Sequence, residues 1–182
     1  MKMLQPYVVR RLSLADVPAM VSIIESTRLE YGVHRRTQRL LDPAVLDLHT
    51  TYQEPRSDYF VATYADVVAG GGGFAPLDGA DEETCELQRM YLDARHRRMG
   101  VGRLLLKECL RRAARMGFRR CYAETISEMK EAIRFYEAHG FRRLSAPLGI
   151  HGHEHTDCWL ILDLERSTAS SALHPAPDRR QR

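Results

Sequence analysis

The sequence predicts one α/β domain with a mixed, largely antiparallel central sheet flanked by helices. Short runs rich in β-branched and aromatic residues alternate with runs whose apolar residues recur at helical spacing. The runs follow the order β-α-α-β-β-β-α-β-α-β-β, in which three successive strands indicate antiparallel hairpins near the start. With 182 residues, the chain is long enough to bury one sizeable core.

The first half of the chain carries four predicted strands and two predicted helices. The strands are expected at 7–12, 59–64, from 67 onward and 84–92. Ser13 and Asp16 form a capping box that begins the first helix. Pro43 suits the first turn of a second, short helix, which follows a polar connection at 27–41.

Four consecutive glycines, Gly70 to Gly73, stand within the predicted third strand. Glycine weakens a strand, because its backbone is flexible and it has no side chain to pack. The run therefore indicates either a bulge or a stretch of backbone that another group must approach closely.

The second half of the chain alternates helices and strands. We expect a helix at 100–116 ended by Gly117, a strand at 119–124, a helix with Met129, Ala132, Ile133 and Tyr136 on its apolar face, and a strand pair at 141–144 and 157–164. Ser, Ala, Pro and Arg dominate from residue 166 onward. Such a segment buries too little surface to offset its ordering entropy, so we expect a domain at 1–165 and a disordered tail at 166–182.

Composition and charge exclude several classes of protein. A net charge of +3 is mild, whereas a general nucleic-acid binder is usually more basic. Residues 1–11 contain no apolar signal region, and no apolar run approaches the length of a membrane span. The four cysteines are widely spaced without a Cys-x-x-Cys pair, which is typical of reduced thiols. We therefore expect a cytoplasmic protein that binds neither nucleic acid nor membranes.

The stretch Arg97 to Leu106 has the features of a pyrophosphate site. Gly100 and Gly102 precede a helical run and let a ligand approach their backbone. The first amides of that helix lack intrahelical acceptors and carry the positive end of the helix dipole. A Walker loop would need Lys-Ser/Thr after its last glycine, and a dinucleotide fingerprint would need a third glycine at Leu105. The pattern that remains is Arg-x-x-Gly-x-Gly, beginning at Arg97.

This pattern resembles the acetyl-CoA signature of the GNAT family of N-acetyltransferases. The resemblance covers about residues 5–165, since the element order is that of the family, Cys85 to Leu92 is similar to its fourth strand, and Ala132 to Phe141 is similar to its Ala-x-x-x-Tyr-x-x-x-Gly-Phe motif. It implies acetyl-CoA as cosubstrate. The implied cofactor-binding residues are Met90, Tyr91, Leu92, Arg97, Arg98, Gly100, Val101, Gly102 and Arg103.

Two residues depart from the family pattern. Met129 stands where many members have an asparagine that bonds near the cofactor, and a methionine side chain has no N–H group to donate. Arg98 stands where many members have a further glycine. A charged residue is tolerable there, in a loop that needs positive charge.

Acetyl transfer to an amine requires three groups. The amine must lose a proton, because an ammonium with a pKa of about 10 has no lone pair at neutral pH. Glu86 matches the acidic residue that many members carry on the fourth strand, so it is the candidate base, acting through water; the alternative is a surface glutamate. Tyr136 is the candidate acid for the departing thiolate, or else a packing tyrosine. The resemblance implies that the Met90 N–H is the oxyanion donor.

The acceptor is the least determined part of the site. The resemblance places 27–41 over the acceptor pocket, and the candidate substrate-binding residues are Tyr31, Arg35, Arg36, Glu124 and His153. An arginine pair suits a carboxylate, which indicates a small amino-acid-like amine with an acidic group. Both arginines could equally be solvated, and Glu124 could be a surface carboxylate at a strand end. The alternation of His151, His153 and His155 is compatible with a metal site. A loop is the favoured interpretation of this segment, so no metal is expected.

Taken together, the sequence predicts an acetyl-CoA-dependent N-acetyltransferase. It would transfer the acetyl group directly, in a ternary complex, to the primary amine of a small molecule. Two alternatives stay open. One is a transferase that acts on a protein lysine or N-terminus, and the other is a non-catalytic acyl-CoA-binding module. A homodimer is also left open.

Overall fold

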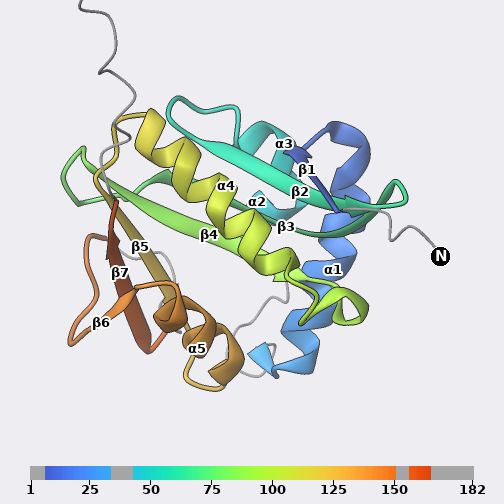
Figure 1. The fold of residues 1–182 in the computed structure, drawn as a ribbon. Coiled ribbons are helices and arrows are strands. Elements are labelled where there is room, and N and C mark those ends of the chain that lie inside the picture. Colours follow the sequence, from blue (N-terminus) through green and yellow to red (C-terminus); the bar gives the residue numbers. More distant parts are fainter. Residues whose placement is uncertain (1–6, 34–42, 151–155, 165–182) are drawn as a thin grey trace, which may run out of the picture.

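A computed structural model describes residues 7–33, 43–150 and 156–164, and Figure 1 shows its fold. A single seven-stranded sheet has the order β1-β2-β3-β4-β5-β7-β6. The strands are β1 (Val8–Arg11), β2 (Asp58–Tyr64), β3 (Val67–Pro76), β4 (Thr84–Leu92), β5 (Arg120–Thr125), β6 (Arg142–Leu144) and β7 (Cys158–Asp163). Neighbouring strands are antiparallel except β4 and β5, which run parallel. The predicted fold class is confirmed.

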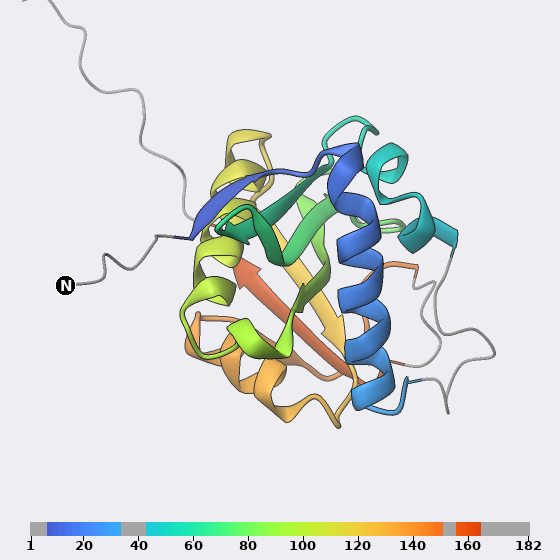
Figure 2. The same cartoon turned by 90° about the vertical axis from the view of Figure 1, so that its right-hand side faces the viewer.

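The helices cover both faces of the sheet. They are α1 (Val17–Glu30), α2 (Pro43–Leu46), α3 (Leu48–Thr51), α4 (Val101–Arg115) and α5 (Lys130–Ala138), with single 3-10 turns η1 (Leu14–Asp16) and η3 (Ala94–His96). α4 and α5 pack on one face, and α1 to α3 pack on the other (Figure 2). Each face thus has its own apolar cluster, as a three-layer α/β domain requires.

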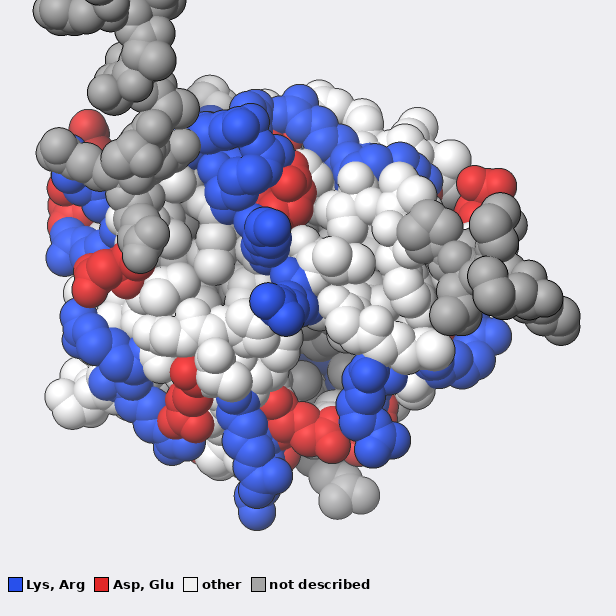
Figure 3. All heavy atoms as spheres, viewed as in Figure 1, with Lys and Arg blue, Asp and Glu red and all other residues white. Residues whose placement is uncertain are grey.

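The alternation of side chains along β2 divides the core between these two clusters. Phe60 and Ala62 point toward α4, whereas Tyr59 and Val61 point toward α1. On α4, Leu105 and Cys109 lie in the first cluster, while a line of basic side chains follows the exposed side of the helix (Figure 3). Buried residues thus recur every second residue along the strand and about every 3.6 residues along the helix, as the sequence predicts.

The pairing of β4 with β5 stops halfway along both strands. Only Thr84–Leu87 pairs with Arg120–Ala123. Beyond Leu87 and Ala123 the two strands no longer pair with each other, and β5 continues to pair with β7. The sheet therefore opens between β4 and β5, and this opening positions the site described below.

Most predicted elements are confirmed, with small differences. The capping box is present, since the Ser13 amide and hydroxyl both donate to the Asp16 carboxylate at 2.8 and 2.6 Å. The helix expected at Pro43 is two short helices, α2 and α3. No helix in the described parts of the chain is long and apolar enough to cross a membrane. The tail expected at 166–182 lies outside the described residues.

Candidate active site

Two cavities meet at the opening between β4 and β5. The larger has a volume of about 310 Å³ and lies between α4, α5 and the end of α1. The smaller has a volume of about 130 Å³ and lies on the α1 side of the sheet. Tyr91 and Met129 line both cavities, so the two cavities are neighbours at this point.

The larger cavity brings together almost all the residues expected to bind the cofactor. Its lining includes Met90, Tyr91, Leu92, Arg97, Arg98, Gly100, Gly102 and Arg103, together with Tyr136. Val101 is the exception, because its side chain is buried in the core beneath α4. On the surface this region is a hollow below the N-terminal end of α4 with basic side chains on its rim (Figure 3).

The N-terminal end of α4 has the geometry of an anion site. Gly100 is the N-cap residue with a φ of +83°, and a Cβ atom there would meet nothing within 4 Å. Its backbone is therefore open to a ligand. The preceding loop also uses the left-handed region, since Arg98 has a φ of +60°. That conformation favours glycine, which explains why glycine suits this position in a related loop.

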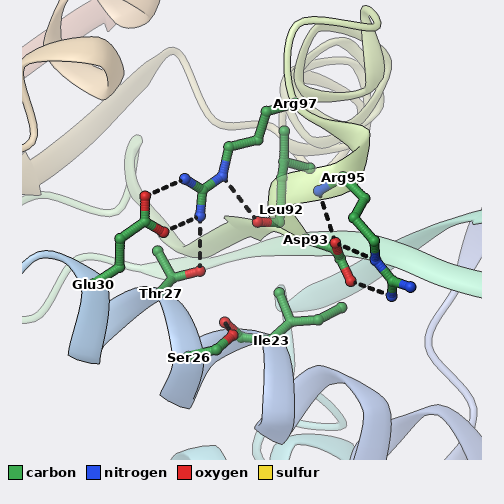
Figure 4. Close-up of polar contacts among 8 residues, drawn as sticks. All are labelled: Ile23, Ser26, Thr27, Glu30, Leu92, Asp93, Arg95 and Arg97. Atoms are coloured by element: carbon green, nitrogen blue, oxygen red, sulfur yellow. Dashed lines mark hydrogen bonds and ion pairs between the residues drawn. The ribbon is translucent and has the colours of Figure 1, made fainter.

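Arg97 holds the loop in place by binding to α1. Its guanidinium donates to both carboxylate oxygens of Glu30 at 2.7 Å, and its Nε donates to the Leu92 carbonyl oxygen at 3.3 Å (Figure 4). This pairing lowers the pKa of Glu30. Arg97 was expected to bind the cofactor, and the structure places it on the cavity wall with its charge already paired to a carboxylate.

The remaining arginines of the loop differ in whether their charge is paired with a carboxylate. Arg95 is paired with Asp93 at 2.7 Å (Figure 4). Arg98 and Arg103 form no ion pair within the part of the chain that the structure describes. These two are the cations on this rim whose charge is available to a phosphate. The open Gly100 backbone, the α4 amides and these two charges fit the diphosphate of acetyl-CoA.

Tyr136 is a buried residue that lines the larger cavity. It lies on the buried face of α5, with its ring centroid 5.6 Å from that of Phe135 and 5.4 Å from that of Phe141. Burial raises the pKa of its phenol well above the ordinary value, so the hydroxyl stays protonated. Among the described residues this hydroxyl has no hydrogen-bond partner. A protonated phenol that faces a cavity is suited to donate a proton there.

The smaller cavity contains two carboxylates near the point where β4 and β5 part. Glu86 is 9% exposed, and its carboxylate accepts a hydrogen bond from Gln88 at 2.5 Å. Glu124 accepts from the hydroxyls of Tyr122 at 3.2 Å and Thr156 at 3.3 Å. Both residues line this cavity, which brings together the candidate base and Glu124, a candidate substrate-binding residue.

The same cavity is also lined by two arginines. Arg28 comes from α1 and Arg89 from β4. The Arg28 Nε is buried and has no hydrogen-bond partner within the described residues. Sequence reasoning missed Arg28, although its register contains a signal. Arg28 follows the fully buried Met20 and Ile24 at intervals of four residues. A charged residue therefore stands on the buried face of α1.

The other residues expected at the acceptor are placed differently. Tyr31 lies in the larger cavity, with its ring 6.0 Å from the Arg97 guanidinium carbon. Arg35, Arg36 and His153 lie outside the described residues. Met129 has a polar contact, because its sulfur accepts a hydrogen bond from the Thr125 hydroxyl at 3.5 Å.

Comparison with known proteins agrees with this geometry. The model of the acetyltransferase (GNAT) family matches residues 21–141, which is more than half of the chain. The uncharacterized N-acetyltransferase YjgM of Escherichia coli (strain K12) is 40% identical over 155 residues, covering 85% of this chain and 92% of YjgM. YwnH of Bacillus subtilis (strain 168), a proposed phosphinothricin acetyltransferase, is 30% identical over 128 residues, covering 69% of this chain and 78% of YwnH.

Solved structures show the same fold. A GNAT-family acetyltransferase from Staphylococcus aureus Mu50 has a TM-score of 0.75 at 17% identity, covering 88% of this chain and 100% of the other. The proposed acetyltransferase yncA from Salmonella typhimurium, solved with acetyl-CoA, has a TM-score of 0.71 at 22% identity, covering 92% and 99%. The family match and the likeness to YjgM identify this chain as a member of the GNAT family of N-acetyltransferases, whose acetyl donor is acetyl-CoA.

Proposed function

We propose that this protein transfers the acetyl group directly to the primary amine of a small acceptor that also carries an acidic group. The observation that carries the proposal is the meeting of the two cavities at Tyr91 and Met129. A donor held in the larger cavity and an amine held in the smaller would meet there without a covalent enzyme intermediate. No cysteine lies among the described lining residues of either cavity, which also favours direct transfer.

The residues of the larger cavity would hold and activate the donor. Acetyl-CoA supplies an activated thioester when bound. The backbone amides at the start of α4, with Arg98 and Arg103, would bind its diphosphate. The Met90 N–H would donate a hydrogen bond to the thioester carbonyl oxygen, where negative charge develops. Tyr136, kept protonated by burial, would give its proton to the departing sulfur.

The residues of the smaller cavity would prepare the acceptor. Glu86, acting through a water molecule, would take the proton that the ammonium must lose before it attacks. Glu124 lies in the same cavity, where its charge would favour an amine-bearing molecule. The small volume of about 130 Å³ suits a compact molecule better than a peptide segment.

Arg28 supports an acidic group on the acceptor. A guanidinium in a cavity pairs well with a carboxylate, phosphinate or phosphate, and the buried Nε of Arg28 has no partner among the described residues. Arg28 and Glu86 both line this cavity, so one molecule could place its acid and its amine against opposite charges. The relative YwnH is named for phosphinothricin, an amino acid that carries a phosphinate.

The test is a panel of acceptors assayed by release of free CoA thiol. Each amino acid is matched with its decarboxylated amine and its amide, and lysine peptides form a separate arm. We expect turnover of the anionic amines to exceed that of their neutral partners by at least tenfold, the value of one charged pair worth about 1.4 kcal/mol. Arg28→Ala should raise the acceptor KM for the anionic class alone. Equal activity on both classes would refute the acidic acceptor, and activity confined to peptides would refute the small acceptor.

A further inference from the structure

The four glycines of β3 are not among the described residues that line the two cavities. They instead make room for two aromatic rings. A Cβ atom at Gly71 would lie 2.7 Å from Cε1 of Tyr59. A Cβ atom at Gly73 would lie 2.5 Å from Cδ2 of Tyr59 and 2.9 Å from Cε1 of Tyr52. Real side chains do not approach this closely. Only glycine at these positions lets both tyrosines lie across β3.

Both tyrosines reach over β3 to the same place on β4. The Tyr59 hydroxyl donates to the Arg89 carbonyl oxygen at 2.8 Å. The Tyr52 hydroxyl donates to the Gln88 side-chain oxygen at 2.9 Å and accepts from Nη1 of Arg89 at 3.0 Å. Their ring centroids are 4.9 Å apart. Burial raises the pKa of Tyr52 to about 12 and raises that of Tyr59 well above its usual value, so both remain hydrogen-bond donors.

The place that they reach is a bulge. Gly73 pairs with Gln88 and Gly71 pairs with Tyr91, so two residues of β4, Arg89 and Met90, lie opposite Gly72 alone. Arg89 has a φ of +49°, a conformation that non-glycine residues adopt only where their surroundings hold them.

The bulge divides β4 between the two cavities. Gln88 and Arg89 both line the smaller cavity, although successive residues of a regular strand point to opposite faces. Met90 and Leu92 then line the larger cavity. Without the extra residue, the side chains beyond the bulge would exchange faces.

The Tyr59 hydrogen bond also fixes the direction of one particular amide. The Arg89 carbonyl and the Met90 N–H belong to the same peptide, which is trans, so they point in opposite directions. Tyr59 holds the carbonyl toward β2 and β3. The Met90 N–H is therefore directed to the other side of β4, where β5 has diverged and the sheet is open.

We propose that Tyr59, supported by Tyr52, is a positioning residue that aims the Met90 N–H at the thioester carbonyl, and that the glycines of β3 make room for it. This inference rests on the proposed role of the Met90 amide as a donor in acetyl transfer. Tyr59 touches neither substrate, so it acts through the peptide that it holds.

The test is Tyr59→Phe, which keeps the ring and removes only the hydroxyl. Loss of a whole oxyanion donor lowers kcat by about 10² to 10³. A donor that is present but less well aimed should cost less, on the order of tenfold. The affinity for CoA, measured by calorimetry, should stay within about twofold, because the diphosphate site on α4 is separate. The 15N–1H signal of Met90 should shift. That of Gly102 should not, because Gly102 lies in the cradle, by which we mean Gly100 and the first backbone amides of α4.

The matched control is Tyr64→Phe, the same change at the end of the same strand. The Tyr64 hydroxyl has no hydrogen-bond partner within the described residues, so kcat and the Met90 signal should match those of the wild type. If Tyr59→Phe lowers only the melting temperature, with kcat and the Met90 signal unchanged well below that temperature, its role is structural and the inference is overturned. The Met90 signal needs no acceptor. A wild type that acetylates no amine would refute the proposed function, and the signal would still decide whether Tyr59 orients the amide.

Discussion

The substitution Gly100→Asp should weaken CoA binding strongly while leaving the protein folded. With a φ of +83°, a residue other than glycine at this position costs about 1–2 kcal/mol of folding free energy. No atom lies within 4 Å of the added Cβ, so no further clash is expected. An aspartate tolerates the left-handed region and is favourable at the start of a helix, which offsets part of this cost. The melting temperature should therefore fall by only a few degrees.

The effect on CoA binding should be much larger. A carboxylate about 5 Å from a diphosphate of charge about −2 is repelled by about 2 kcal/mol in water, and by several times more where the surroundings exclude water. A loss of affinity of at least about 30-fold is expected. Calorimetric titration with CoA, beside a thermal melt, measures both quantities on one preparation.

Gly117 offers a matched control at the other end of α4. It has a φ of +92°, and a Cβ atom there also meets nothing within 4 Å. Gly117→Asp should show a comparable or larger loss of stability, because a negative charge is unfavourable at a helix C-terminus, and unchanged CoA affinity. Wild-type CoA affinity in folded Gly100→Asp would refute the assignment of the cradle.

Three further predictions concern other groups of the site. Tyr136→Phe should lower kcat by about 10²-fold and leave the acetyl-CoA KM nearly unchanged; an unchanged kcat would exclude Tyr136 as the acid. Glu86→Gln should slow the reaction and remove the limb of the kcat/KM pH profile that reports the base, whereas an intact limb would move that role to Glu124. Glu30 has a lowered pKa from its pair with Arg97, so its stabilisation is present above the unfolded-state value of 4.5 and is lost as the pH falls through the lower folded-state value. Glu30→Gln should thus reduce the melting temperature by less than about 4 °C at about pH 7 and not at about pH 2, and equal effects at both values would contradict an ionic role.

Local signals were sufficient to predict the sheet and most of the helices. The glycine pair at Gly100 and Gly102 also predicted an anion site, and Gly100 is the open N-cap residue of α4, a backbone geometry that depends on few distant residues. The four glycines of β3 led to two expectations, a bulge or a close approach. The structure contains both, since β3 has an extra residue, Ala69, where it pairs with β2, and tyrosine rings make the close approach.

Contacts between distant segments could not be predicted in the same way. Arg97 was assigned to the cofactor from its motif, but Glu30 lies 67 residues away and holds its guanidinium. The position of Arg28 in the smaller cavity depends on how α1 crosses β4, and the sequence contains only its register. Tyr31 lines the larger cavity for the same reason. Local periodicity sets which face a residue occupies, whereas the packing of helices on the sheet sets which cavity that face meets.

The most direct test of the account is a crystal structure of the protein with CoA and a slow acceptor analogue. The account predicts the diphosphate at the N-terminal end of α4 and the pantetheine arm in the opening between β4 and β5. The sulfur should lie beside the Tyr136 hydroxyl, and the analogue's amine should lie on the Glu86 side of Tyr91 and Met129. A CoA molecule bound elsewhere, or an amine separated from the sulfur by these side chains, would contradict it.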